Sequence, residues 1–173
     1  MRQTLYDETV TRAWGEWVAG LGEWHVFGGL TYDPKRRFTD AATGDWVRPA
    51  DHTVLHHARA WLRESERRLG RPIEAAVVAL EHHKSGWPHL HPLVRVAGGL
   101  LGNEFSTLGQ TWFERHGYAR LEEPRDQLDV ASYAAKYLMK DLARGDVLLW
   151  PLRGPLGTHQ PQMSDPGTQP CVA

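Results

Sequence analysis

The sequence predicts an α+β domain, in which a central hairpin of strands is combined with amphipathic helices. Two apolar, β-rich runs at 73–81 and 89–96 are separated by the turn sequence HHKSGWP, which is typical of a hairpin. Segments with helical spacing of apolar residues precede and follow this hairpin. The chain has 173 residues, of which 41% are hydrophobic and 24% charged, so it is long enough for one sizeable core.

Before the hairpin, the sequence predicts a helix, a strand with a basic loop, and a second helix. Residues 7–21 have apolar side chains at helical spacing and stop at Gly22, which predicts a helix. Residues 24–32 alternate and are β-rich, so they predict a strand, and the sequence DPKRRFTDAATGD after it predicts a turn and an exposed basic loop. A long amphipathic helix is expected from Asp51, as its N-cap, to the stop at Gly70.

The elements after the hairpin begin with a helix at 103–117, which Asn103 caps. An edge strand at 118–123, a helix at 126–145 and a short last strand at 146–150 complete the predicted domain, which spans residues 1–150. Residues 151–173 are rich in Pro, Gly, Gln and Ser, and they predict a flexible tail.

Composition excludes several classes of protein. The only cysteine is Cys171, which rules out a disulfide framework and a Cys-rich zinc module and fits a reducing cytoplasm. The sequence has no signal-peptide pattern at its start and no apolar run of the ~18–20 residues that span a membrane. We therefore expect a cytoplasmic protein with no membrane partner. A net charge of -1 argues against a large nonspecific nucleic-acid binder.

A candidate metal site lies on the predicted hairpin. His89 and His91 are two residues apart on a strand, so their side chains share a face, and Leu90 points to the other face. The hairpin brings Glu81 level with them. Two imidazoles and one carboxylate suit Mn²⁺ or Mg²⁺, and Zn²⁺ can also bind such a set in vitro. The alternative is a surface or half-buried pair of histidines without a metal.

A candidate nucleophile lies on the last predicted helix. In the sequence SYAAKYLMK, Tyr133 and Tyr137 are neighbours on one helical face, with Lys136 and Lys140 alongside. A tyrosine, with its ordinary pKa of ~10, needs a nearby cation to act as a nucleophile. The alternative is that the tyrosines pack in the core and the lysines lie at the surface.

Together these motifs resemble those of the HUH endonucleases of the rolling-circle replication initiator (Rep) family, in which U is a hydrophobic residue. HLH at 89–91 resembles the metal motif, YAAKY at 133–137 the tyrosine motif, and GGLTYDP at 28–34 the strand motif that precedes both. The resemblance covers roughly residues 24–141. It implies a central antiparallel β-sheet flanked by helices, in a ferredoxin-like or RRM-like arrangement.

The resemblance also implies a mechanism. Glu81, His89 and His91 would hold a divalent cation at the scissile phosphate of single-stranded DNA, and Tyr133 would attack the phosphorus. The products are a 5′-phosphotyrosine link and a free 3′-hydroxyl, and the reverse reaction joins strands. Lys136 would assist Tyr133, and Tyr137 is either a second nucleophile or a packing residue.

The partners implied by the resemblance are single-stranded DNA at a replication origin, with or without a hairpin, and the helicase and polymerase of a host cell that carries a plasmid or phage. Eight residues are candidates for DNA contacts, because they are basic, polar or aromatic and lie in or near the motifs. They are Thr31, Tyr32, Lys35, Arg36, Arg37, Lys84, Trp87 and Lys140. For the basic loop, simple solvation is the competing interpretation.

Other functions remain open at this point. A single-strand DNA transposase of the HUH class also has the metal motif followed by a tyrosine on a helix. A conjugative relaxase fits less well, because its tyrosine lies near the N-terminus, ahead of the metal motif. A non-catalytic module is the third alternative, in which the histidines bind metal passively and the tyrosines are core residues.

Overall fold

A computed structural model describes residues 2–33, 35, 43, 47–127, 130 and 147–150. The predicted helix at 126–145 and the predicted tail at 151–173 lie almost entirely outside these residues. The described elements are α1 (Arg2–Gly20), β1 (Val26–Tyr32), α2 (Asp51–Leu69), β2 (Ile73–His82), β3 (Pro88–Val96), α3 (Glu104–Phe113), β4 (Gly117–Glu122) and β5 (Val147–Trp150).

The strands form one antiparallel sheet in the order β4-β1-β3-β2-β5. The predicted hairpin of β2 and β3 is central in this sheet, and β4 is an edge strand, as the sequence indicated. The chain order β1-α2-β2-β3-α3-β4 with the spatial order 4-1-3-2 is the ferredoxin-like arrangement, to which β5 is added beside β2. The predicted α+β fold with a central antiparallel sheet and flanking helices is therefore confirmed.

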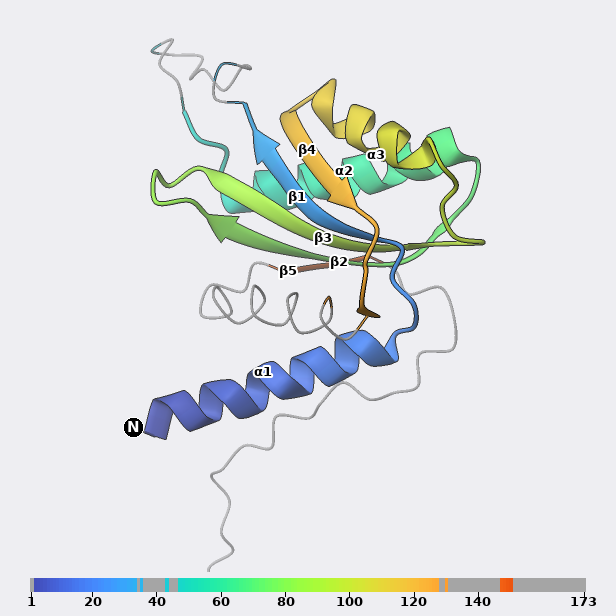
Figure 1. Cartoon of the computed structure of the whole chain (residues 1–173). Coiled ribbons are helices and arrows are strands. Elements are labelled where there is room, and N and C mark those ends of the chain that lie inside the picture. The colour runs from blue at the N-terminus through green and yellow to red at the C-terminus, as the bar shows by residue number, and fades with distance from the viewer. Residues whose placement is uncertain are drawn as a thin grey trace, which may run out of the picture.

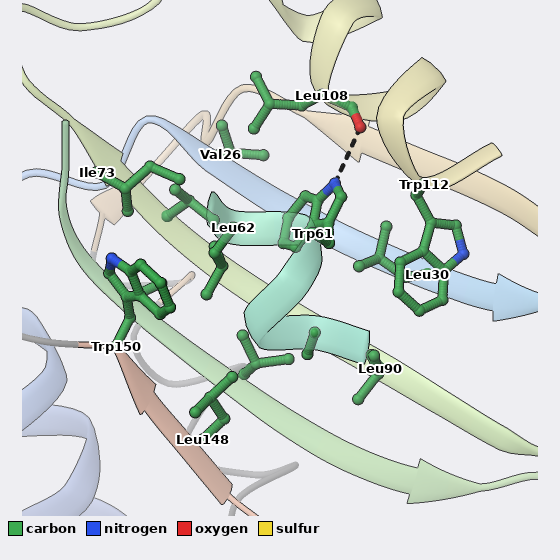
Figure 2. Packing of buried hydrophobic residues seen from close by; sticks show 14 of the residues in the cluster. Val26, Leu30, Trp61, Leu62, Ile73, Leu90, Leu108, Trp112, Leu148 and Trp150 are labelled. Carbon is green, nitrogen blue, oxygen red and sulfur yellow. Dashed lines mark hydrogen bonds between the residues drawn. The ribbon is translucent and has the colours of Figure 1, made fainter. Parts of the chain in front are cut away.

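Helices cover both faces of the sheet (Figure 1): α2 and α3 lie on one face and α1 on the other. The core on the α2/α3 face, part of which is drawn in Figure 2, is built from every second residue of the strands, such as Leu30, Leu90 and Leu148. Trp61 of α2 lies in its centre, and its indole Nε1 donates a hydrogen bond of 3.0 Å to the backbone oxygen of Leu108 in α3. This bond links the two helices above the sheet.

The core on the α1 face uses the intervening strand residues. Val77 of β2 and Leu93 of β3 pack there with Val18 of α1 and with Trp24, which precedes β1. Val130 belongs to the same cluster. Because alternate strand residues belong to two different cores, each strand residue has a defined face, and this fixes where the polar side chains of the strands point.

Two helix ends differ from the sequence prediction. Asp51 is the first helical residue of α2 rather than its N-cap, which is Ala50, and its Oδ1 lies 2.9 Å from Nε2 of His82 on β2. Helix α3 ends at Phe113 and not at Gly117, because Gly117 already belongs to β4. Gly117 has φ +155, and a side chain there would meet the backbone of β1.

Within the described ranges, no helix combines the length and the apolar character that a membrane span requires.

Candidate functional site

The three predicted metal ligands lie together on the α1 face of the sheet. Glu81 is an even number of residues from the buried Val77 on β2, and His89 and His91 are an even number from Leu93 on β3. Their side chains therefore point to the same face as these core residues. In the β2–β3 register, Glu81 is directly opposite His89. The hairpin thus places two imidazoles and a carboxylate side by side, as the sequence predicted.

His91 contacts the other two members of this group. Its Nε2 lies 2.9 Å from Oε2 of Glu81, which is its diagonal neighbour across the hairpin. Its ring is 4.5 Å from that of His89, with an interplanar angle of 72°. The side chain of His91 is only 10% exposed. A largely buried imidazole beside a carboxylate is a strong pair of donor atoms for a metal ion.

His89 is held from β1. Its Nδ1 lies 2.8 Å from Oγ1 of Thr31, which is its partner in the β1–β3 register. Burial, together with smaller contributions from the nearby His91 and His83, lowers the pKa of His89 to about 4, and Glu81 acts in the opposite direction. His89 is therefore neutral at pH 7, the state in which an imidazole can donate a lone pair to a metal.

The donor types and their closeness fit a divalent cation. As the side chains stand, no three His, Cys, Asp or Glu residues in the described ranges are arranged to hold one ion. Nε2 of His91 lies 2.9 Å from Oε2 of Glu81. A cation that both groups bind would take the place of the proton between them.

A groove adjoins the histidines on the side of β1 and β4. Its volume is about 480 Å³, and His89, His91, Gly29, Tyr118 and Arg120 are among the residues that line it. Tyr118 and Arg120 are not among the site residues that the sequence predicts. The alternation in the edge strand, GYARLE, shows that they share a face, but which face this is can be assigned only when the neighbouring strand is known.

The structure places the predicted DNA-contact residues in different environments. Lys35 and Lys84 are exposed, and Lys84 lies in the turn between β2 and β3. Thr31 lines the groove and contacts His89. Trp87 packs against the core on the α2/α3 face and is half-buried.

Tyr32 is a correction to the predicted DNA interface. It is 2% exposed on the α2/α3 face, opposite to the histidines, and its hydroxyl lies 3.1 Å from Nδ1 of His57. Burial raises its pKa. Adjacent strand residues point to opposite faces, so Thr31 and Tyr32 cannot both reach DNA bound on one face.

Six further candidates lie outside the residues that the structure describes. They are Arg36, Arg37, Tyr133, Lys136, Tyr137 and Lys140. The described residue nearest to the YAAKY motif is Val130, which packs in the core of the α1 face. Val130 thus lies on the face of the sheet that carries Glu81, His89 and His91.

Comparison with protein-family models and with curated proteins finds no match for this sequence.

Proposed function

We propose that this protein is a metal-dependent enzyme that nicks and rejoins single-stranded DNA with a tyrosine nucleophile, and that it initiates rolling-circle replication. The observation that supports this most is that the proposed metal ligands and Val130, near the tyrosine motif, lie on the same face of the sheet. Glu81, His89 and His91 lie side by side on the α1 face, and Val130, three residues before Tyr133, packs on the same face. Three residues of extended chain span at most ~11 Å, which limits how far Tyr133 can be from Val130.

In the proposed reaction, His89, His91 and Glu81 bind and orient a divalent cation. When bound, the cation supplies positive charge for a non-bridging oxygen of the scissile phosphate. The hydroxyl oxygen of Tyr133 attacks the phosphorus, a new O–P bond forms, and the bond from phosphorus to the 3′-oxygen breaks. The phenolic proton is transferred to the departing 3′-oxygen. The products are a 5′-phosphotyrosine and a 3′-hydroxyl, so the energy of the phosphodiester is kept for rejoining.

The lysine between the two tyrosines has a supporting role in this proposal. Lys136 stabilises the phenolate of Tyr133 or binds the phosphate as a point charge. Tyr137 takes the second strand in a following round, since it would occupy the same helical face as Tyr133.

The test is a search for the covalent adduct. The full chain is incubated with Mn²⁺ and a pool of single-stranded oligonucleotides, and adducts are resolved on a denaturing gel and mapped by mass spectrometry. We expect an adduct on Tyr133 that is lost with EDTA, with His91→Ala and with Tyr133→Phe. Tyr6→Phe is the control for loss of a tyrosine hydroxyl, because Tyr6 lies on α1 and outside the motifs, and it should leave the adduct unchanged. Tyr137→Phe should permit the first cleavage and prevent the second.

A non-catalytic metal-binding or DNA-binding module is the second candidate. The observation that favours it is the direct contact of His91 with Glu81, which stabilises the pair without a metal ion. This candidate predicts no adduct from a folded, metal-loaded protein, and a Tyr133→Phe variant that changes stability alone. An adduct that transfers DNA to a second strand in a dimer would instead favour a transposase.

A further inference from the structure

The groove beside the histidines is formed where the edge strand β4 pairs with β1. In this register Tyr118 is opposite Thr31, and Arg120 is opposite Gly29. Paired residues of antiparallel strands share a face, so Tyr118 and Arg120 project on the same face as the histidines. The groove is therefore continuous with the proposed metal site and lies between it and the edge of the sheet.

Two glycines of β1, Gly28 and Gly29, line this groove. A Cβ at Gly29 would lie only 2.7 Å from Nε2 of His89, so the missing side chain at this position lets the imidazole lie against β1 at the edge of the groove. The groove has a volume of about 480 Å³, which falls in the range of small-ligand sites.

Tyr118 presents an aromatic surface at the rim of the groove. It is 59% exposed, and the centroid of its ring lies 6.3 Å from that of the exposed Phe113 at the end of α3. Aromatic residues at such positions offer a platform on which an unpaired base can stack. A base in a duplex is stacked on both sides and cannot use this platform.

Arg120 supplies the charge that a nucleic-acid strand requires. Its side chain is 87% exposed, and its Nε donates a hydrogen bond of 2.6 Å to Oε1 of Glu122. Exposed ion pairs of this kind contribute little to stability because water and salt screen them, so a phosphate can displace Glu122 at little cost. The guanidinium is also the cation best suited to phosphate oxygens.

We propose that the groove between β1 and β4 binds one unpaired nucleotide that flanks the scissile phosphate, with its base on the ring of Tyr118 and its phosphate at Arg120. This inference rests on the proposed activity on single-stranded DNA and assigns it a substrate subsite. Tyr118 and Arg120 bind and position the strand, and they do not take part in the chemical step.

Equilibrium binding tests the subsite separately from the chemistry. Fluorescence anisotropy is measured with the full chain in EDTA and a labelled pool of random-sequence single-stranded oligonucleotides. We expect Tyr118→Ala to weaken binding about 5- to 150-fold, which is about 1–3 kcal/mol for one stacked base. Tyr118→Phe keeps the ring and should bind like the wild type. Leu149→Ala, which removes another exposed apolar side chain at the opposite edge of the sheet, is the matched control.

The salt dependence of binding tests Arg120. Arg120→Gln should lower the slope of log affinity against log salt concentration by about 0.7, the value for one phosphate contact on a single strand. Arg67→Gln removes another exposed arginine, on α2, and should leave this slope unchanged. When the same oligonucleotides are double-stranded, the wild type and Tyr118→Ala should bind them equally well.

The outcomes distinguish the subsite from the proposed enzyme. If Tyr118→Ala and Arg120→Gln bind like the wild type while the Tyr133 adduct forms, the subsite is wrong and the enzyme stands. If both variants bind more weakly but no adduct forms, the subsite stands in a DNA-binding module. If the wild-type chain does not bind single strands at all, both proposals fail.

Discussion

The imidazole of His89 is positioned by two residues of β1. Thr31 contacts its Nδ1 at 2.8 Å, and Gly29 leaves space beside its Nε2. Outer contacts of this kind orient a metal ligand and typically change metal affinity about 10- to 100-fold when they are lost. Thr31, which the sequence predicted only as a contact to DNA, thus lies beside a proposed metal ligand.

Gly29→Ala should impair the site without unfolding the protein. The new Cβ would meet the end of the His89 side chain, which can rotate, so we expect a folded variant with adduct formation reduced about 10-fold or more. Circular dichroism monitors the fold and a denaturing gel the adduct.

Gly28→Ala is the matched comparison for this prediction. At φ +152 its Cβ would lie 2.0 Å from the backbone oxygen of Arg120, which cannot move away without opening the β1–β4 pair. We expect strong destabilisation here. Equal activity of wild type and Gly29→Ala would contradict the role of this space.

The sequence predicted that Glu81, His89 and His91 lie on one face because they belong to one hairpin with period-2 alternation, and the strand register has this arrangement. It misplaced Tyr32 for a different reason. A strand pattern shows that Thr31 and Tyr32 face opposite ways, but it does not show which face carries the site when both faces are covered by helices. Only the packing of Leu30 and Tyr32 under α2 and α3 decides this.

Helices α2 and α3 meet β1 through a second group of histidines. His57 of α2 stacks on His116, which follows α3, at a centroid distance of 4.4 Å and an angle of 26°. Trp112 and Tyr32 pack against the same His116 ring. Burial, together with smaller contributions from the charges of His57 and Arg115, lowers the pKa of His116 to about 4. The pKa of His57 is lowered as well, first by burial.

This arrangement predicts acid sensitivity of the packing of the two helices. The unfolded chain binds the proton of His116 near pH 6.5 and the folded chain only near pH 4, so the unfolded state holds more protons between these values. The stabilisation is complete above about pH 6.5 and decreases as the pH falls toward about 4. Denaturant titrations across this range, in EDTA, should show the decrease.

His116→Phe keeps an aromatic ring in the stack and removes the titrating group. The free energy of unfolding of this variant should depend less on pH than that of the wild type. His89 contributes in the same pH range in both proteins, and the comparison removes its effect. An identical pH dependence would show that the His57–His116 pair does not control acid stability.

The strands and the helix at 51–69 were predictable from local periodicity. The helix ends were not, because they depend on partners far along the chain. Asp51 suited an N-cap by residue type, but it contacts His82 across the domain. The end of α3 is set by the pairing of Gly117 with Tyr32, which no helical pattern contains.

For the molecule as a whole, metal binding should raise the stability of the fold. An ion that binds only the folded chain adds about 2.7 kcal/mol at about 100 times its Kd. For a chain of this size that raises Tm by about 5–10 °C. Differential scanning calorimetry with and without Mn²⁺ should show this shift for the wild type, and His91→Ala should abolish it.

His52→Ala is the control for nonspecific binding of Mn²⁺ to histidines, since His52 is exposed on α2. It should retain the full shift. A Tm that is insensitive to Mn²⁺, Mg²⁺ and Zn²⁺ in the wild-type chain would remove the metal from the proposed mechanism.

The groove between β1 and β4 is formed by residues that are distant in the sequence, so it could not be predicted from the sequence. Tyr118 and Thr31 are far apart in the chain and become neighbours only because β4 pairs with β1 in one register. An isolated Tyr-x-Arg on a predicted edge strand has no distinguishing feature until that register is known. The subsite is therefore a property of the strand order and not of a motif.

The β2–β3 hairpin has a consequence for how the protein folds. Glu81, His89 and His91 are joined by one short turn, so bringing them together closes only a small loop, at low entropic cost. The β1–β4 pairing closes a much longer stretch of chain and is expected to form more slowly. A folding chain would thus assemble the proposed metal ligands early and complete the nucleotide groove late, so that the ligands precede the substrate site they are proposed to serve.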